Sequence, residues 1–185
     1  MLLIFTGDGK GKTSSAAGIA LRAWGQDRRV LFISFLKGSN IAGEYKAIKR
    51  IEDSNFQVYT FGRECPYPGT DCCPGQQECI IQAGQITEQD FNQVKLGLDK
   101  LRNEMAAGRW DLIVLDEFIN VFNLFDSCRE EILQLIDQRK PECDLILTGR
   151  KSPSELNSRA DLVSEITVLK HPYQCGMMAK RGIDY

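Results

Sequence analysis

The sequence has no apolar run that approaches the roughly 20 residues of a membrane-spanning helix. Its apolar start is too short and wrongly flanked for a signal peptide, so we expect a cytoplasmic protein that does not bind a membrane. The sequence also has no large excess of either charge, because 23 Lys and Arg residues are nearly balanced by 25 Asp and Glu residues. Without a basic excess, nucleic acid is not expected as a partner.

Histidine is scarce and cysteine is irregularly placed. His171 is the one histidine in the chain, and we interpret it as structural. The cysteines number seven, and an odd count without a signal peptide argues against a secreted disulfide framework. Cys128, Cys143 and Cys175 are scattered and are expected to be buried small apolar side chains.

A glycine-rich turn follows the apolar residues 2–5 at the start of the chain and reads Thr6-Gly7-Asp8-Gly9-Lys10-Gly11-Lys12-Thr13. A strand, closely spaced glycines and Lys-Thr opening a helix at residues 14–24 are the context of a phosphate-binding loop. Backbone N–H groups and the helix N-terminus would cradle a triphosphate, Lys12 would contact its terminal phosphates, and Thr13 would ligate magnesium. The expected binding residues are Gly7, Asp8, Gly9, Lys10, Gly11, Lys12 and Thr13.

The spacing of this loop departs from the usual pattern. Gly-x4-Gly-Lys-Ser/Thr would need glycine at position 6, where Thr6 stands instead. A loop with altered spacing can hold the phosphate chain differently from an ordinary hydrolase. Attack at the terminal phosphorus is therefore not assumed.

The pattern of apolar segments predicts one α/β domain over residues 1–185. Strands are expected at residues 2–5, 30–36, 56–61, 111–115, 144–148 and 162–169. Helices are expected at residues 14–24, 42–52, 87–107 and around 132–136. Strands alternating with helices imply right-handed crossovers and a three-layer sandwich with a mostly parallel sheet, as in the RecA-like type of P-loop NTPase.

Acidic residues end the apolar stretch at residues 111–117. This Walker B pattern places Asp116 and Glu117 near magnesium, as ligands or as holders of its waters. Asp8, Lys37 and Arg150 also follow predicted strands, so all five residues should gather at the carboxyl edge of the sheet, where open parallel sheets bind ligands.

A long irregular loop at about residues 62–85 contains the remaining cysteines, Cys65, Cys72, Cys73 and Cys79. Its thiolates are sufficient for zinc or an iron–sulfur cluster, although the paired Cys-x2-Cys spacing of most zinc sites is missing. Reduced thiols or an oxidised pair are the alternatives.

Several segments together resemble a known family. They are the turn at residues 6–13, Leu21-Arg22-Ala23, Phe35-Leu36-Lys37-Gly38, Gly43-Glu44, Leu115-Asp116-Glu117, Leu147-Thr148-Gly149-Arg150, Ala160-Asp161-Leu162-Val163-Ser164-Glu165, Lys170-His171-Pro172 and Gly182-Ile183-Asp184-Tyr185. In this order they are similar to the P-loop corrinoid adenosyltransferases, which transfer adenosyl from ATP to cobalamin.

The resemblance implies a transferase in which a Co(I) corrinoid attacks the 5′ carbon of ATP and triphosphate leaves. The nucleophile then belongs to the substrate, so no Ser, Cys or His nucleophile is needed. By this similarity Lys12, Asp116 and Glu117 are the catalytic residues, and Thr13 and Glu117 hold Mg²⁺. Arg22 and Arg150 would contact nucleotide or phosphate, although solvated or ion-paired roles remain open for both. A homodimer and an electron donor such as a flavoprotein are also implied.

Two other functions stay open. A nucleoside kinase of the thymidine kinase type also joins a phosphate-binding loop, an acidic strand end and a loop with four cysteines. A non-catalytic module that binds corrinoid in an ATP-dependent manner would share the same nucleotide site.

Overall fold

A parallel sheet flanked by helices forms the protein in a computed structural model, which describes residues 1–38, 42–64, 81, 84–171, 176–177 and 180–183. One six-stranded sheet has the order β3-β2-β4-β5-β1-β6, and every strand pair in it is parallel. The strands are β1 (Leu2–Thr6), β2 (Val30–Phe35), β3 (Phe56–Phe61), β4 (Leu112–Asp116), β5 (Asp144–Thr148) and β6 (Leu162–Glu165). The predicted α/β fold with a mostly parallel sheet is confirmed.

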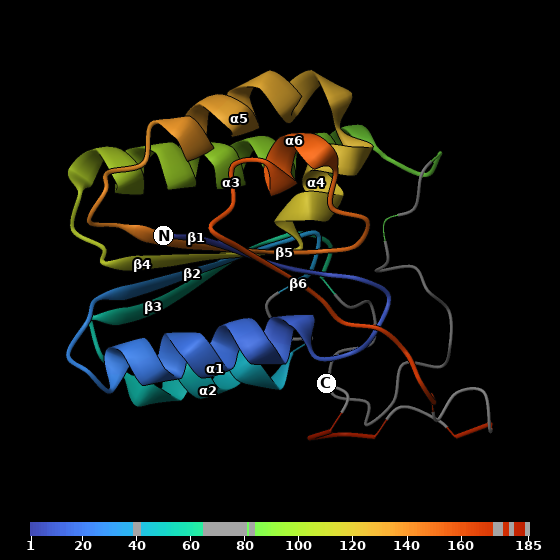
Figure 1. The fold of residues 1–185 in the computed structure, drawn as a ribbon, viewed down its shortest axis with the longest axis horizontal. Helices are drawn as coiled ribbons and strands as arrows, with labels where there is room; N and C mark the ends of the chain where they lie inside the picture. The colour runs from blue at the N-terminus through green and yellow to red at the C-terminus, as the bar shows by residue number, and fades with distance from the viewer. Residues whose placement is uncertain (39–41, 65–80, 82–83, 172–175, 178–179, 184–185) are drawn as a thin grey trace.

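Helices cover both faces of the sheet and make three layers (Figure 1). On one face lie α1 (Lys12–Trp24) and α2 (Gly43–Ile51). On the other lie α3 (Glu88–Ala107), α4 (Phe118–Leu124), α5 (Arg129–Asp137) and α6 (Ser154–Asn157), with a 3-10 turn at Asp126–Cys128. Each face has its own hydrophobic cluster, so β2 and β4 are buried along their full length.

Local signals explain the helices that the sequence predicted best. Thr87 caps α3 by accepting from the Asp90 N–H, while the Asp90 carboxylate accepts from the Thr87 N–H, and Gly108 ends the helix at φ 64°. Small buried side chains at Ala16 and Ala20 let α1 lie close to the sheet.

Three short elements were not predicted, namely α4, the 3-10 turn and α6. Helix α4 has only seven residues, which is shorter than the window of about 11 to 18 residues over which a helical period is recognised in a sequence. Strand β6 ends at Glu165 rather than near 169, because its pairing with β1 ends at the partner Thr6.

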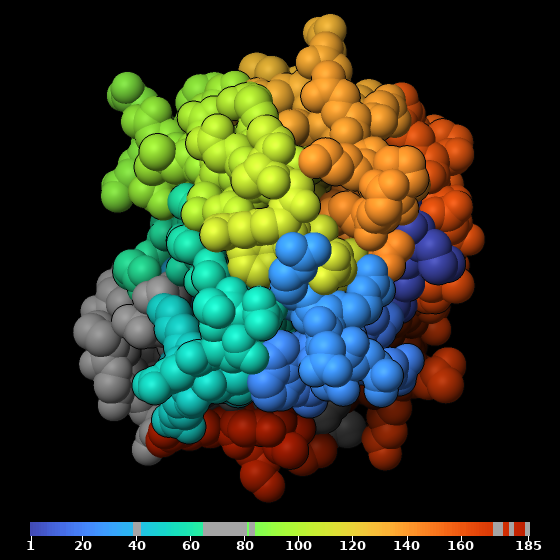
Figure 2. Space-filling view, turned by 90° about the vertical axis from the view of Figure 1, so that its left-hand side faces the viewer, coloured from blue at the N-terminus to red at the C-terminus, as the bar shows by residue number. Residues whose placement is uncertain are grey.

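The topology brings separate segments to the two edges of the sheet. Strand β5 lies between β1 and β4, so the phosphate-binding loop after β1 and the acids at the end of β4 meet at the carboxyl edge. Figure 2 faces the opposite, amino edge, where the α1–β2, α3–β4 and α5–β5 connections lie side by side. Among the residues described, no helix combines the length and apolarity needed to cross a membrane.

Candidate active site

The phosphate-binding loop needs glycine for two physical reasons. Gly7 and Gly11 have φ values of 100° and 112°, which side chains of L residues disfavour. The loop also packs on the chain leaving β6, where a Cβ on Gly7 would lie 2.4 Å from the Ile166 carbonyl oxygen. Because Gly9 N–H donates to that same oxygen at 2.8 Å, β6 holds the loop in shape.

Lys12, the first residue of α1, spans this loop. Its Nζ donates to the carbonyl oxygens of Gly7 and Gly9, each at 2.7 Å. Partial burial, with a smaller contribution from the charge of Arg150, lowers the pKa of Lys12. The ammonium is thus held by neutral carbonyls rather than by a carboxylate, which leaves its charge available to an anion.

Asp116 is the centre of a buried hydrogen-bond network at the end of β4. Its side chain is 0% exposed. Thr13 and Thr148 hydroxyls donate to Oδ1 at 2.8 and 2.6 Å, and Tyr45 OH donates to Oδ2 at 2.8 Å. Burial raises the pKa of Asp116, but the charge of Lys37 and these hydrogen bonds outweigh it, so the pKa lies below its ordinary value.

Lys37 joins the two acids. Its Nζ lies 3.2 Å from Asp116 Oδ2 and 2.7 Å from Glu117 Oε1. Burial lowers the pKa of Lys37, yet the charges of Asp116 and Glu117 together raise it, so the lysine is cationic. Glu117 has a φ of 59°, donates its N–H to Thr148 Oγ1 at 3.0 Å and accepts from Asn120 Nδ2.

The oxygens of Thr13, Asp116 and Glu117 fit a magnesium ion. Mg²⁺ is usually bound by one or two carboxylates, substrate phosphates and water rather than by an all-protein cage. Among the residues described, no group of three or more His, Cys, Asp or Glu forms such a cage. A cation already lies among these oxygens, because the Lys37 ammonium contacts all three residues.

The remaining predicted residues lie at different distances from this cluster. Arg150 follows β5, and its Nη1 is 3.9 Å from Asp8 Oδ1, an exposed pair at the rim of the loop. Lys10 lies in the loop between β1 and α1 and is exposed. Arg22 is exposed in the last turn of α1, about 15 Å along the helix from Lys12 at 1.5 Å per residue. The structure therefore does not bring Arg22 to the loop within this chain.

The predictions for the cysteines fall into two groups, because the structure describes two of the seven cysteines and not the other five. Cys128 and Cys143 are buried and free, as predicted, and burial raises the pKa of the Cys143 thiol to about 11. Cys175 lies outside the described residues, and so do the four cysteines of the loop at 62–85, namely Cys65, Cys72, Cys73 and Cys79.

Sequence reasoning placed Lys37 at the correct edge but did not assign Lys37, Tyr45 or Thr148 to the site. The ring of Tyr45 is buried in α2, and its hydroxyl also lies 2.6 Å from Ser34 Oγ. A tyrosine on the apolar face of a helix resembles core in a sequence, and only the packing of α2 on the sheet brings it to Asp116. For Thr148, its position as the last residue of a buried strand, one residue beyond the Leu115–Leu147 pair of β4 and β5, was an available signal.

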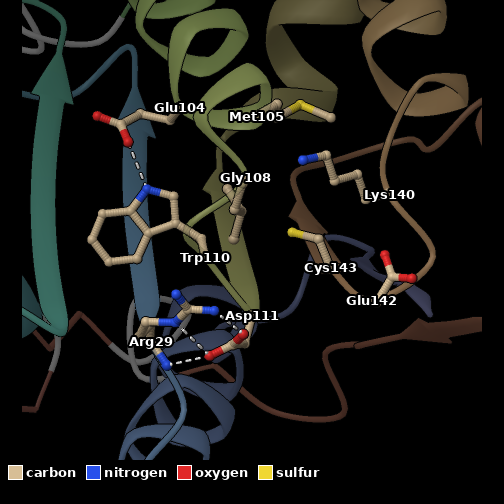
Figure 3. Close-up of a pocket in the computed structure, with 10 residues that line it drawn as sticks. Arg29, Glu104, Met105, Gly108, Trp110, Asp111, Lys140, Glu142 and Cys143 are labelled. Carbon is tan, nitrogen blue, oxygen red and sulfur yellow. Dashed lines mark hydrogen bonds and ion pairs between the residues drawn. The ribbon is translucent and has the colours of Figure 1, made fainter.

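A cavity of about 170 Å³ opens at the amino edge, away from the phosphate-binding loop (Figure 3). Its polar groups pair with one another, because Trp110 Nε1 donates to Glu104 at 2.7 Å and Arg29 pairs with Asp111. Lys140 and Cys143 face these pairs across the cavity. Arg29, Asp111 and Glu104 at this edge are therefore committed to partners within the protein.

Comparison with known proteins places the chain in a family. The model for ATP:corrinoid adenosyltransferases BtuR/CobO/CobP matches residues 1–185. The chain belongs to this family. It is 29% identical over 185 residues to a corrinoid adenosyltransferase of Escherichia coli strain K12, covering 100% of this chain and 85% of that protein.

Two further relatives are also named corrinoid adenosyltransferases. The corrinoid adenosyltransferase CobA of Salmonella typhimurium is 28% identical over 185 residues, covering 100% of this chain and 85% of that protein. One from Sinorhizobium is 26% identical over 187 residues, covering 100% and 80%. The family resemblance inferred from the ordered motifs is confirmed.

Proposed function

We propose that this protein is an ATP:corrinoid adenosyltransferase. The Co(I) lone pair of the corrinoid attacks the 5′ carbon of ATP and forms a cobalt–carbon bond. The bond between C5′ and O5′ breaks, its electron pair leaves with triphosphate, and cobalt is formally oxidised to Co(III). The observation that carries this proposal is the family match over residues 1–185.

The site supports the proposal because the reaction asks for orientation and charge neutralisation rather than a protein nucleophile. In the proposed reaction the loop at residues 7–13 holds the leaving triphosphate and Lys12 exchanges two carbonyls for phosphate oxygens. Thr13 and Glu117 would ligate magnesium, with Asp116 orienting a bound water. The metal would offset negative charge on the leaving group. Arg150, at the rim of the loop, and Arg22 are proposed nucleotide contacts.

The test is a reaction of the full chain with ATP, magnesium and chemically reduced cobalamin under anaerobic conditions. We expect the visible spectrum to change to that of an alkyl corrinoid, with one inorganic triphosphate released per cobalt–carbon bond. Lys12→Ala should slow the change by about 100-fold or more. Lys49→Ala, which removes an exposed lysine in the last turn of α2, is the matched control.

Other products would identify the alternatives. ADP formed with a deoxynucleoside would establish a kinase of the thymidine kinase type. ATP-sensitive corrinoid binding without a cobalt–carbon bond would establish a binding module. Either result overturns adenosyl transfer.

Four features accompany the proposal. Residues 1–185 would be one domain, cytoplasmic in location, and limited proteolysis of the full chain would test the domain. The active form would be a homodimer, to be measured by light scattering after size exclusion. An electron donor such as a flavoprotein would supply Co(I), and coupling to a reduced flavoprotein would test this.

A metal or cluster at Cys65, Cys72, Cys73 and Cys79 is a further proposal, in which zinc or an iron–sulfur cluster orders the loop near the corrinoid. Metal analysis and a visible spectrum of anaerobically purified protein would decide it. Protein without bound metal would contradict it.

A further inference from the structure

Lys37 places its ammonium among the oxygens of Glu117, Asp116 and Thr13. Its Nζ lies 2.7 Å from Glu117 Oε1, 3.2 Å from Asp116 Oδ2 and 3.5 Å from Thr13 Oγ1. These are the residues to which the proposed function assigns magnesium. A single protein cation thus lies among the oxygens that would surround the metal or its waters.

The backbone around Lys37 is built to hold it there. Leu36 leaves β2 with a φ of 61°, uncommon for a side chain of its size, and its N–H donates to the Phe61 carbonyl at 2.7 Å. The neighbouring strand comes so close that a Cβ on Gly62 would lie 2.3 Å from Lys37 N. Strained backbone at a site of clustered charge is typical of functional residues.

The two cations cannot share this position. Lys37 neutralises one of two adjacent carboxylates, and its side chain is 27% exposed. Adding a divalent ion within about 4 Å of the ammonium would create strong like-charge repulsion in a partly buried site. The four-carbon stem of a lysine is flexible, so its ammonium can turn while the backbone stays fixed. A triphosphate on the loop would offer new anionic oxygens to it.

We propose that Lys37 is a resident cation that occupies the magnesium position in the nucleotide-free protein and moves to a phosphate oxygen when nucleotide arrives. Magnesium then binds together with the triphosphate and not before it. The inference rests on the proposed function only in taking a magnesium nucleotide as ligand. Since coupling between two ligands is reciprocal, magnesium should also strengthen nucleotide binding through this exchange.

The test uses Mn²⁺ as a paramagnetic probe of the magnesium position, with the full chain and no corrinoid. Free and bound Mn²⁺ are measured by electron paramagnetic resonance with and without ATP. For the wild type we expect weak Mn²⁺ binding that ATP strengthens. Lys37→Met removes the charge and keeps most of the stem, so it should bind Mn²⁺ without ATP at least tenfold more tightly than the wild type.

A matched control is Lys49→Met, which removes an exposed lysine of α2 and should behave as the wild type. Equal Mn²⁺ affinity of wild type and Lys37→Met in the absence of ATP would overturn the proposal. Should Lys37→Met be poorly folded, Lys37→Gln provides a second test by thermal unfolding. Mg²⁺ alone should raise its Tm and leave that of the wild type unchanged, and no rise for the variant would again overturn the proposal.

The experiments distinguish an error in the role proposed for Lys37 from an error in the proposed function. Adenosyl transfer by a wild type that binds Mn²⁺ freely without ATP would keep the reaction and refute the role of Lys37. Nucleotide-dependent Mn²⁺ binding without cobalt–carbon bond formation would do the reverse.

Discussion

Two aspartates at opposite ends of β4 have the same chemistry and different surroundings. Asp111, just before the strand, pairs with Arg29, which reaches both carboxylate oxygens at 2.7 and 3.1 Å. Its side chain is 30% exposed, whereas that of Asp116 is 0% exposed. Asp111 therefore joins the α1–β2 and α3–β4 connections at the amino edge. Asp116 is hydrogen-bonded to Thr13 and paired with Lys37, both of which belong to the proposed nucleotide site.

The difference shows how a sheet separates stability from function. At the amino edge, partly exposed ion pairs such as Arg28 with Asp144 join neighbouring segments. At the carboxyl edge, the buried Asp116 carboxylate contacts Thr13 and Lys37, to which we assign roles in binding magnesium and nucleotide. Removing the first kind should cost little stability, and removing the second should cost stability and activity together.

The largest contrast is expected between Asp116→Asn and Asp111→Asn. An amide at position 116 places an NH₂ against donors and leaves the Lys37 ammonium with one fewer anion, which should cost about 3 kcal/mol and at least 100-fold in adenosyl transfer. The exposed pair at Asp111 should cost about 1 kcal/mol or less. Urea unfolding followed by tryptophan fluorescence, with the transfer rate, measures both. Equal stability losses would contradict the comparison.

Lys12→Ala should lower the rate of adenosyl transfer and leave stability nearly unchanged. Transfer should fall by about 100-fold or more, because the charge facing the leaving triphosphate is lost. The free energy of unfolding should change by about 1 kcal/mol or less, since the lysine bonds only neutral loop carbonyls. Kinetics and urea unfolding test this, and a stability loss as large as that of Asp116→Asn would show that the loop is a structural element.

Tyr45→Phe tests how much the tyrosine hydroxyl contributes to the buried hydrogen-bond network around Asp116. The variant keeps the ring in the core and removes one donor to Asp116 and the contact with Ser34. About 1 to 2 kcal/mol of stability should be lost, with a smaller effect on transfer than Asp116→Asn. Urea unfolding measures the loss. Tyr59→Phe at a half-buried hydroxyl of β3 is the control, and a similar loss there would refute a special role for Tyr45.

The sequence predicted those features whose signals are local. Strand Phe56–Phe61 and helix Glu88–Ala107 depend on neighbours within a few residues, and both were predicted at nearly the correct bounds. The phosphate-binding loop and the acids at Asp116 and Glu117 were found for the same reason. Strand order and the hydrogen bond from Tyr45 to Asp116 depend on contacts between distant segments, which no single stretch encodes. Arg22 was predicted by resemblance alone, and it lies at the far end of α1.

The pH dependence of stability should reveal the smallest effect, that of Asp111. Hydrogen bonds from Arg29, opposed by slight burial, lower the pKa of Asp111 to about 2 from an ordinary value of 3.8. A carboxyl group with a lowered folded-state pKa stabilises above its unfolded pKa, so this contribution should be complete above about pH 5 and lost as pH falls towards 2. The difference in thermal unfolding between wild type and Asp111→Asn should therefore shrink as pH falls from 5 towards 2. High salt should also narrow their difference at neutral pH, because a partly exposed pair is screened. A difference that stayed constant with pH and salt would mean that Asp111 acts through packing, and the contrast with Asp116 would then be one of degree.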